Sequence, residues 1–262
     1  MKRKIMICGI FHSWSNRAWK MAKPISFIIL FAFLSNVLLY ATTSSAKDTA
    51  NMYSLDNVSG WNLRKVSAVP VNFKGRKALK VELLPSVIAG TYGVDYIDRD
   101  TVAVIPGTEG FRDGVIEVDV IGALSPTAPD YARGFIGVAF RVTGDLSSFG
   151  AYYIRPTNAR ADDQIRRNHS MQYFSFPDYP FSRLRKEEPE RYEAYSDLDM
   201  NDWTHLKIEV RQGAAKFYIN HAAQPSLIVS DLKLPENTSG SVAFWTEIGT
   251  EAYFSNLQIH RY

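Results

Sequence analysis

The sequence has almost no cysteine: Cys8 is the only one among 262 residues. It lies in a leader that we expect to be removed, which leaves no thiol for a disulfide, a nucleophile or a metal site. The sequence also lacks a Gly-rich phosphate loop, a Gly-x-Ser-x-Gly elbow and a His pair with zinc spacing. These absences argue against nucleotide, serine-hydrolase and zinc chemistry of the familiar kinds.

Acidic residues are absent from the first 46 positions, which carry six Lys or Arg side chains. An apolar run from Ile25 to Tyr40 follows, and small polar residues lead to Ala46. The run has about 16 residues, short of the roughly 20 that span a bilayer core. This order predicts a signal peptide over residues 1–46, cleaved after Ala46, rather than a retained anchor. We therefore expect a secreted or periplasmic protein without a stable membrane anchor.

Removal of the leader reverses the sign of the net charge. The chain has 30 Lys and Arg against 27 Asp and Glu, and loss of six basic residues leaves 24 against 27, so +3 becomes −3. The basic character therefore belongs to the leader. A mildly acidic mature protein is not expected to bind nucleic acid.

The remaining sequence has the period of β-strands. Apolar and charged residues alternate over 79–83, 116–120 and 206–210, which is typical of strands with one wet face. No segment beyond the leader has the apolar stripe of a core-facing helix. We expect one all-β domain over residues 47–262, a two-sheet antiparallel jelly-roll sandwich that begins with a loose arm to about residue 60. More apolar runs predict further strands at 101–105, 134–142, 150–155, 170–176, 214–220, 240–246 and 252–260.

Six motifs occur in a familiar order in the second half of the chain. They are GVIEVDV from Gly114, GFIGVAFR from Gly134, WTHLKIEV from Trp203, KFYIN from Lys216, GSVAFW from Gly240 and AYFSNLQI from Ala252. This succession resembles the concanavalin A-like lectin/glucanase superfamily, particularly its laminin-G-like and 3-keto-disaccharide-hydrolase-like bacterial members, over about residues 75–262. The resemblance implies a jelly roll with a glycan across its concave face or rim loops, in bacterial polysaccharide metabolism.

The glucanase branch of that superfamily carries two catalytic carboxylates on a Glu-x-Asp-x-Glu strand. Here Glu117 and Asp119 project from one face of a strand, but the third position is Ile121. Glycoside hydrolysis needs a pair of carboxylates on opposite sides of the bond that is cut. We interpret Glu117 and Asp119 as acids on a wet strand face rather than as this pair.

Residues 155–197 interrupt the strand rhythm with arginines, acids and aromatics. A loop of this length in a compact domain is usually functional or disordered, and disordered segments are poor in aromatics. We therefore predict an ordered functional excursion. The alternative is a loop in which Arg and Asp side chains neutralise one another.

Within this excursion we predict His169 as a general acid or base, oriented by Asp163, with Tyr179 for stacking or proton transfer. Arginine forks suit carboxylates, sulfates and paired hydroxyls, and aromatic rings suit the C–H face of a pyranose. The predicted substrate-binding residues are Tyr153, Arg155, Asn158, Arg160, Arg166, Arg167, Tyr173 and Arg183.

The resemblance also implies a structural Ca²⁺ in some members. Asp95, Asp98 and Asp100 form one acidic cluster and Asp197 and Asp199 another, but neither has a specific ligand spacing and turn formation is the better explanation of such aspartates. Our hypothesis is a carbohydrate-active jelly roll, a glycoside hydrolase or polysaccharide lyase if it is an enzyme. Two alternatives stay open: a non-catalytic lectin-like module, favoured by the missing carboxylate, and an envelope domain that binds another protein.

Overall fold

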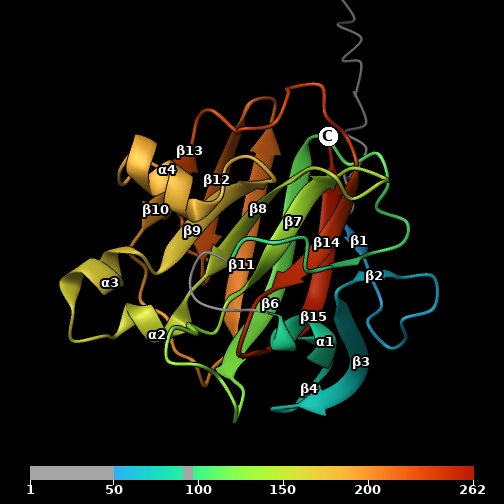
Figure 1. Ribbon diagram of the computed structural model, residues 1–262. Helices are drawn as coiled ribbons and strands as arrows, with labels where there is room; N and C mark the ends of the chain where they lie inside the picture. The colour runs from blue at the N-terminus through green and yellow to red at the C-terminus, as the bar shows by residue number, and fades with distance from the viewer. Residues whose placement is uncertain (1–49, 91–96) are drawn as a thin grey trace, which may run out of the picture. The chain divides into compact units, whose positions relative to one another are not determined.

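The computed structural model describes residues 50–90 and 97–262. The predicted signal peptide, Cys8 and Asp95 lie outside these residues. The described chain belongs to one unit, Ala46–Tyr262, and forms two antiparallel sheets packed face to face (Figure 1). In the described ranges no helix combines the length and the apolar character needed to cross a membrane.

The first sheet, sheet A, has the strand order β13-β12-β11-β6-β15-β4-β3, with β1 paired to β15. Its strands are β1 Asn51–Met52, β3 Val66–Phe73, β4 Arg76–Leu83, β6 Gly114–Leu124, β11 Thr204–Arg211, β12 Ala214–Ile219, β13 Leu227–Val229 and β15 Thr250–Arg261. Sheet B has the order β10-β9-β8-β7-β14-β5-β2. Its strands are β2 Asn62–Arg64, β5 Val102–Val104, β7 Ile136–Val142, β8 Phe149–Ile154, β9 Met171–Phe176, β10 Glu193–Ala194 and β14 Ser241–Thr246.

Sheet A has one buried face and one wet face, as its alternating sequence predicts. Val118 of β6 is fully buried and lies opposite Leu206 of β11, whereas Glu117 and Asp119 are partly exposed. Successive side chains of a strand point to opposite faces, so this alternation sends every second residue into the core. Phe254 of β15 stacks on Phe244 of β14 at 3.9 Å and so joins the two sheets.

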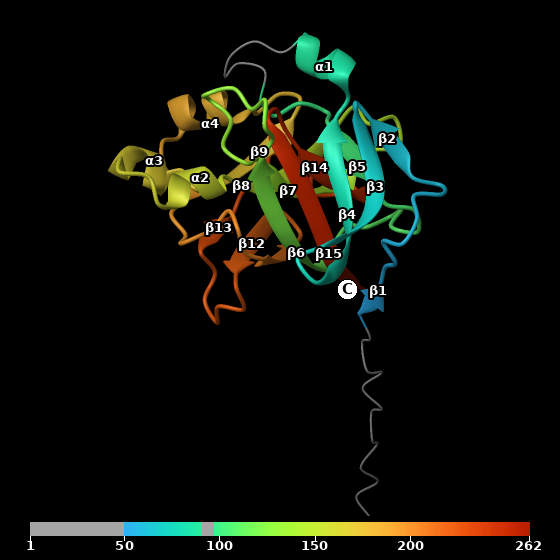
Figure 2. The same cartoon turned by 90° about the horizontal axis from the view of Figure 1, so that it is seen from below.

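Sheet B is buried on both faces. All seven residues of β7 and all six of β8 are buried. On its outer face the indole nitrogen of Trp245 donates to the Arg99 carbonyl at 2.9 Å. The backbone N–H of Phe181 donates to the carboxylate of Asp98 at 2.5 Å. Segment 97–101 and the 181–187 region therefore cover this sheet on the side away from sheet A (Figure 2).

Four short helices lie outside the sheets, where no core-facing helix was expected. In α3 and α4, the helices just before and just after β9, Leu184 of α4 is the only buried residue. Their few buried positions explain why the sequence shows no apolar stripe. The all-β sandwich is as predicted, while β3 was not predicted and β1 replaces part of the expected loose arm. The helices are α1 Pro85–Ala89, α2 Pro156–Ala159, α3 Gln164–Asn168 and α4 Phe181–Glu187.

Candidate functional site

The excursion predicted over residues 155–197 is ordered and extends one edge of sheet B. It contains α2, α3, β9, α4 and β10, and β9 pairs with β8 on one side and β10 on the other. The strand inside the excursion therefore fixes the helices on either side of it to the sheet. This arrangement gathers polar side chains from four separate elements at one place.

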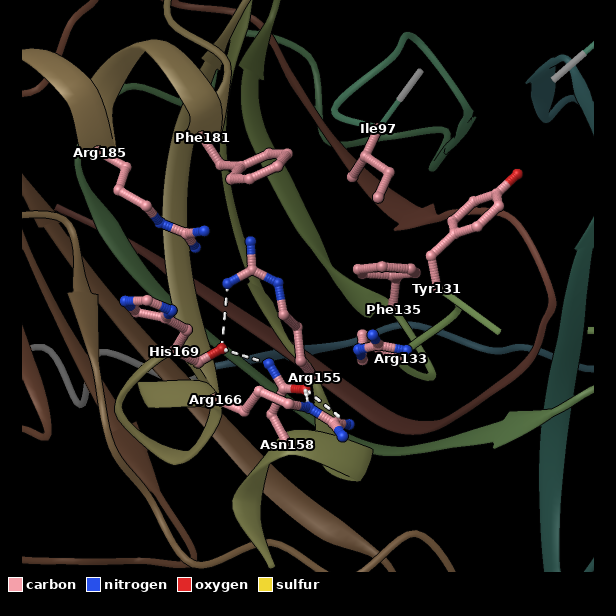
Figure 3. A pocket seen from close by; sticks show the side chains of 10 residues that line it. All are labelled: Ile97, Tyr131, Arg133, Phe135, Arg155, Asn158, Arg166, His169, Phe181 and Arg185. Atoms are coloured by element: carbon pink, nitrogen blue, oxygen red, sulfur yellow. Dashed lines mark hydrogen bonds between the residues drawn. The ribbon is translucent and has the colours of Figure 1, made fainter. Parts of the chain in front are cut away.

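A pocket of about 180 Å³ opens where α2, α3 and α4 meet the end of β8 (Figure 3). Four guanidinium groups line it, together with one imidazole, one amide, three aromatic rings and one aliphatic side chain. No acidic side chain is among the described residues that line it. The lining residues are Ile97, Tyr131, Arg133, Phe135, Arg155, Asn158, Arg166, His169, Phe181 and Arg185.

Arg155 is the buried centre of this pocket, with 4% of its surface exposed. Its guanidinium lies between the rings of Tyr153, at 4.8 Å, and Phe181, at 5.2 Å. It donates to the Tyr153 hydroxyl at 2.6 Å and to the His169 carbonyl at 3.0 Å. Stacking and hydrogen bonds on both sides hold the fork in one orientation.

Glu193 of β10 balances part of the positive charge from behind the pocket. It binds Arg185 through both oxygens, with Nε to Oε2 at 2.9 Å, and receives a longer contact from Arg155 at 3.4 Å. Burial alone raises the pKa of Glu193, but Arg185 and Arg155 outweigh burial and hold it below its usual range. This carboxylate is therefore ionised and serves two arginines.

Arg166 and Arg133 have no such partner. Arg166 reaches the side-chain oxygen of Asn158 at 3.4 Å, and Asn158 is itself held by the His169 carbonyl at 3.1 Å. Arg133 donates to two backbone carbonyls, those of Asp130 and Ala132. Within the described ranges neither guanidinium forms an ion pair with a carboxylate.

His169 is a neutral imidazole at neutral pH. Burial lowers its pKa, and the charges of Arg185 and Arg155 lower it further against the opposing effect of Glu193. The ring nitrogen Nε2 lies 3.6 Å from Glu193, so Glu193 rather than Asp163 is the carboxylate beside this imidazole. Asp163 instead caps α3, because its side chain accepts the backbone N–H groups of Ile165 and Arg166.

The structure brings together His169, Arg155, Asn158 and Arg166 of the predicted site. The other predicted residues lie outside the pocket lining. Tyr153 and Tyr173 are fully buried and pack in the interior, so neither offers a free ring face to a ligand. Tyr179 packs under the guanidinium of Arg183 at 4.3 Å rather than beside His169.

Three predicted arginines contact other side chains on the surface, and two of them pair with carboxylates, as the alternative of a neutralised loop expected. Arg160 pairs with Asp197 at 2.9 Å and with Asp199 at 2.8 Å. Arg183 pairs with Glu187 at 2.9 Å. Arg167 donates to the hydroxyl of Tyr195 at 3.2 Å, and its guanidinium lies over that ring. Arg160 and Arg183 are therefore neutralised at the outer surface, whereas Arg166 in the pocket forms no ion pair among the described residues.

The described aspartates of the expected acidic clusters bind other groups of the protein. Asp100 binds Arg64 and Lys65, while Asp98 lies apart and accepts from α4. Among the described residues no group of three or more His, Cys, Asp or Glu side chains is placed to hold a metal ion. On the outer face of sheet A, Asp119 binds His205 at 2.8 Å and Arg76 at 2.6 Å. These contacts use both carboxylate oxygens of Asp119. This agrees with our interpretation of Asp119 as an acid on a solvent-exposed strand face rather than as one of a catalytic pair.

No family model and no curated protein matches the sequence. Similar solved structures include a Bacillus subtilis protein of unknown function with a galectin-like fold, at 12% identity and TM-score 0.49, covering 81% of this chain and 98% of that one. Another is the carbohydrate-binding module CBM66 from Bacillus subtilis, at 15% identity and TM-score 0.44, covering 76% and 97%. A third is a putative glycosyl hydrolase from Parabacteroides distasonis, at 12% identity and TM-score 0.44, covering 80% and 94%. At these identities the likeness is one of fold alone.

Proposed function

We propose that the protein binds carbohydrate in the pocket centred on Arg155. The observation that carries this proposal is that guanidinium groups in fixed orientations and aromatic rings line the same small cavity. Sugar recognition needs donors at fixed positions for ring oxygens and an apolar surface for C–H groups. Arg166 and Asn158 supply the first, and the partly exposed rings of Tyr131 and Phe181 supply the second.

The binding role is tested with a panel of neutral and acidic polysaccharides in affinity electrophoresis. Tyr131→Ala removes a ring at the partly exposed rim of the pocket and is expected to weaken retardation about tenfold, the effect of losing roughly 1.4 kcal/mol. Tyr195→Ala is the matched control, because this exposed tyrosine belongs to the excursion but not to the pocket. Equal retardation of both variants and the wild type would place binding elsewhere.

A second candidate is catalysis in the same pocket, by glycoside hydrolysis or elimination. One observation favours it: the imidazole of His169 is held neutral beside several guanidinium groups, and a neutral imidazole accepts protons. Reducing ends and the ultraviolet absorbance of unsaturated products measure the two reactions. If the protein is an enzyme, it releases reducing ends or unsaturated products, and His169→Gln loses most of this activity. If it is a binding module, it retards the polysaccharide in the gel but releases neither product.

A further inference from the structure

The pocket has more positive charge than its surroundings neutralise. Its described walls hold the guanidinium groups of Arg133, Arg155, Arg166 and Arg185, and no carboxylate. Among the described residues behind the walls, Glu193 is the one carboxylate that forms ion pairs with any of the four, and it binds only Arg155 and Arg185. At least two positive charges are therefore left without an ion-pair partner in the described part of the chain.

The two unpaired guanidiniums also act on each other. Burial lowers the pKa of Arg133, and the neighbouring positive charges of Arg166 and Arg155 lower it further, with the exposed Asp130 opposing them only in part. Holding like charges together in a half-buried place is unfavourable unless an anion enters between them. Figure 3 shows both side chains reaching the same side of the pocket, below the Phe135 ring.

The neighbouring contacts keep these two forks in position. Arg166 is held by Asn158, whose amide nitrogen is anchored to the backbone of His169. Arg133 is held by the carbonyls of Asp130 and Ala132 in the turn just before β7. Each guanidinium has five donors and only some are used, so free N–H groups are left for a ligand.

We propose that the pocket selects an acidic sugar unit, whose anionic oxygens bind between Arg133 and Arg166. This inference rests on the proposed carbohydrate-binding function and names the class of sugar. Paired N–H donors of a guanidinium match the two oxygens of a carboxylate or sulfate group. The cavity of about 180 Å³ is smaller than the roughly 300 Å³ at which drug-sized ligand pockets begin, so it holds one sugar unit of a chain.

The test compares each polysaccharide with itself after its charge is removed. An oligouronide is measured beside the same oligosaccharide with its carboxylates reduced to alcohols, and a sulfated galactan beside its desulfated form. We expect the wild type to bind at least one anionic form about 10- to 100-fold more tightly than its uncharged counterpart, as charge-assisted hydrogen bonds allow. Preference for the oligouronide identifies a carboxylate, and preference for the galactan identifies a sulfate ester.

Arg133→Gln and Arg166→Gln should each remove most of that preference, because each loss weakens binding of the anionic form much more than binding of the uncharged form. Arg183→Gln is the control, because this exposed arginine lies outside the pocket and pairs with Glu187. Thermal unfolding supplies a second readout. Arg166→Gln should leave the Tm of the free protein unchanged or higher, since it relieves repulsion, whereas a purely structural arginine would lower the Tm.

Two results would overturn different claims. Equal affinity for charged and uncharged forms, unaffected by Arg133→Gln and Arg166→Gln, refutes the acidic sugar and leaves carbohydrate binding intact. Binding of acetate or inorganic sulfate as tightly as any glycan, or no glycan binding by a folded protein, refutes the proposed function itself.

Discussion

At the scale of single residues, the pocket contains arginines in two different electrostatic states. Arg155 and Arg185 share Glu193 and stack on the Phe181 ring, so their charges are partly compensated and their positions fixed. Among the described residues, the hydrogen-bond partners of Arg133 and Arg166 are all uncharged groups. The first pair builds the wall of the pocket, and the second pair is left to interact with what enters it.

The surroundings of Asp98, beside this site, favour its protonated form more than those of an exposed carboxyl do. Asp98 is 5% exposed, one of its oxygens accepts the N–H of Phe181 at 2.5 Å, and the other has no partner among the described residues. Burial raises its pKa to about 7, against the opposing effects of that N–H and of Arg155. A buried carboxyl without a full set of donors favours its neutral form.

This raised pKa predicts that Asp98 makes stability depend on pH. Between about pH 4 and pH 7 the folded protein holds a proton on Asp98 that the unfolded chain has released, so the free energy of unfolding decreases as pH rises. Asp98→Asn keeps an acceptor for the Phe181 N–H but cannot ionise. The stability of the wild type relative to Asp98→Asn should therefore decrease by up to about 1.4 kcal/mol per pH unit in this window. Urea unfolding of both proteins measures this, and parallel pH profiles would show that Asp98 is ionised throughout.

At the scale of elements, the position of Arg133 depends on the close approach of two glycines. A Cβ on Gly122 of β6 would lie 2.2 Å from the carbonyl oxygen of Gly134, the residue next to Arg133. Gly134 has a φ of +70°, which side-chain-bearing residues rarely adopt. The end of β6 thus sets where the loop before β7 lies, and with it the unpaired guanidinium.

Gly122→Ala is therefore expected to affect both stability and binding. The new methyl group meets backbone rather than a flexible side chain, so the loop must move, at a cost of about 1–3 kcal/mol. Acidic glycan binding should weaken along with the Tm, because Arg133 moves with the loop. Gly144→Ala is the control, since a Cβ there meets nothing within 4 Å. If Gly122→Ala unfolds like the Gly144→Ala control, the two backbones are not in the close contact described.

The sequence predicts elements well where one face of a strand is wet. β6 and β11 alternate buried and exposed residues and were located to within a few positions. β3 was missed because its alternation fails after Ala68, where most residues are exposed and where Pro70 is a residue found in strands mainly at sheet edges, as here. α4 was missed because only Leu184 is buried, which is too little to produce a helical period.

The site was only partly predictable for a related reason. Arg155, Asn158, Arg166 and His169 come from one stretch of sequence and were identified by its composition. Arg133 comes from a different loop, the one between β6 and β7, whose sequence has no feature that distinguishes it from other polar loops. Its role depends on the pairing that brings β7 beside β8, which no local pattern encodes. Glu193, which decides which arginines are neutralised, likewise reaches the site through the short strand β10.

At the scale of the whole molecule, charge is distributed unevenly along the chain. The described strands and the pocket belong to the unit Ala46–Tyr262, which carries 24 Lys and Arg against 27 Asp and Glu from residue 47 onward. A cationic pocket on a mildly acidic domain attracts anions over a short range only, because the net charge opposes them at a distance. Selectivity therefore depends on the pocket rather than on the overall charge.

We propose that the basic leader is removed on export, which leaves this acidic domain as the working protein outside the cytoplasm. Expression of the full chain in a bacterium should yield a secreted or periplasmic product whose mass corresponds to a first residue of Lys47. Because the net charge changes from +3 to −3, the product should bind an anion exchanger at pH 7, where the uncleaved chain binds a cation exchanger. A protein made from residue 47 onward should show the same Tm and the same glycan affinity as the exported product, since the sheets and the pocket lie within it. Recovery of the uncleaved mass from the membrane fraction would instead show that the apolar run is retained as an anchor.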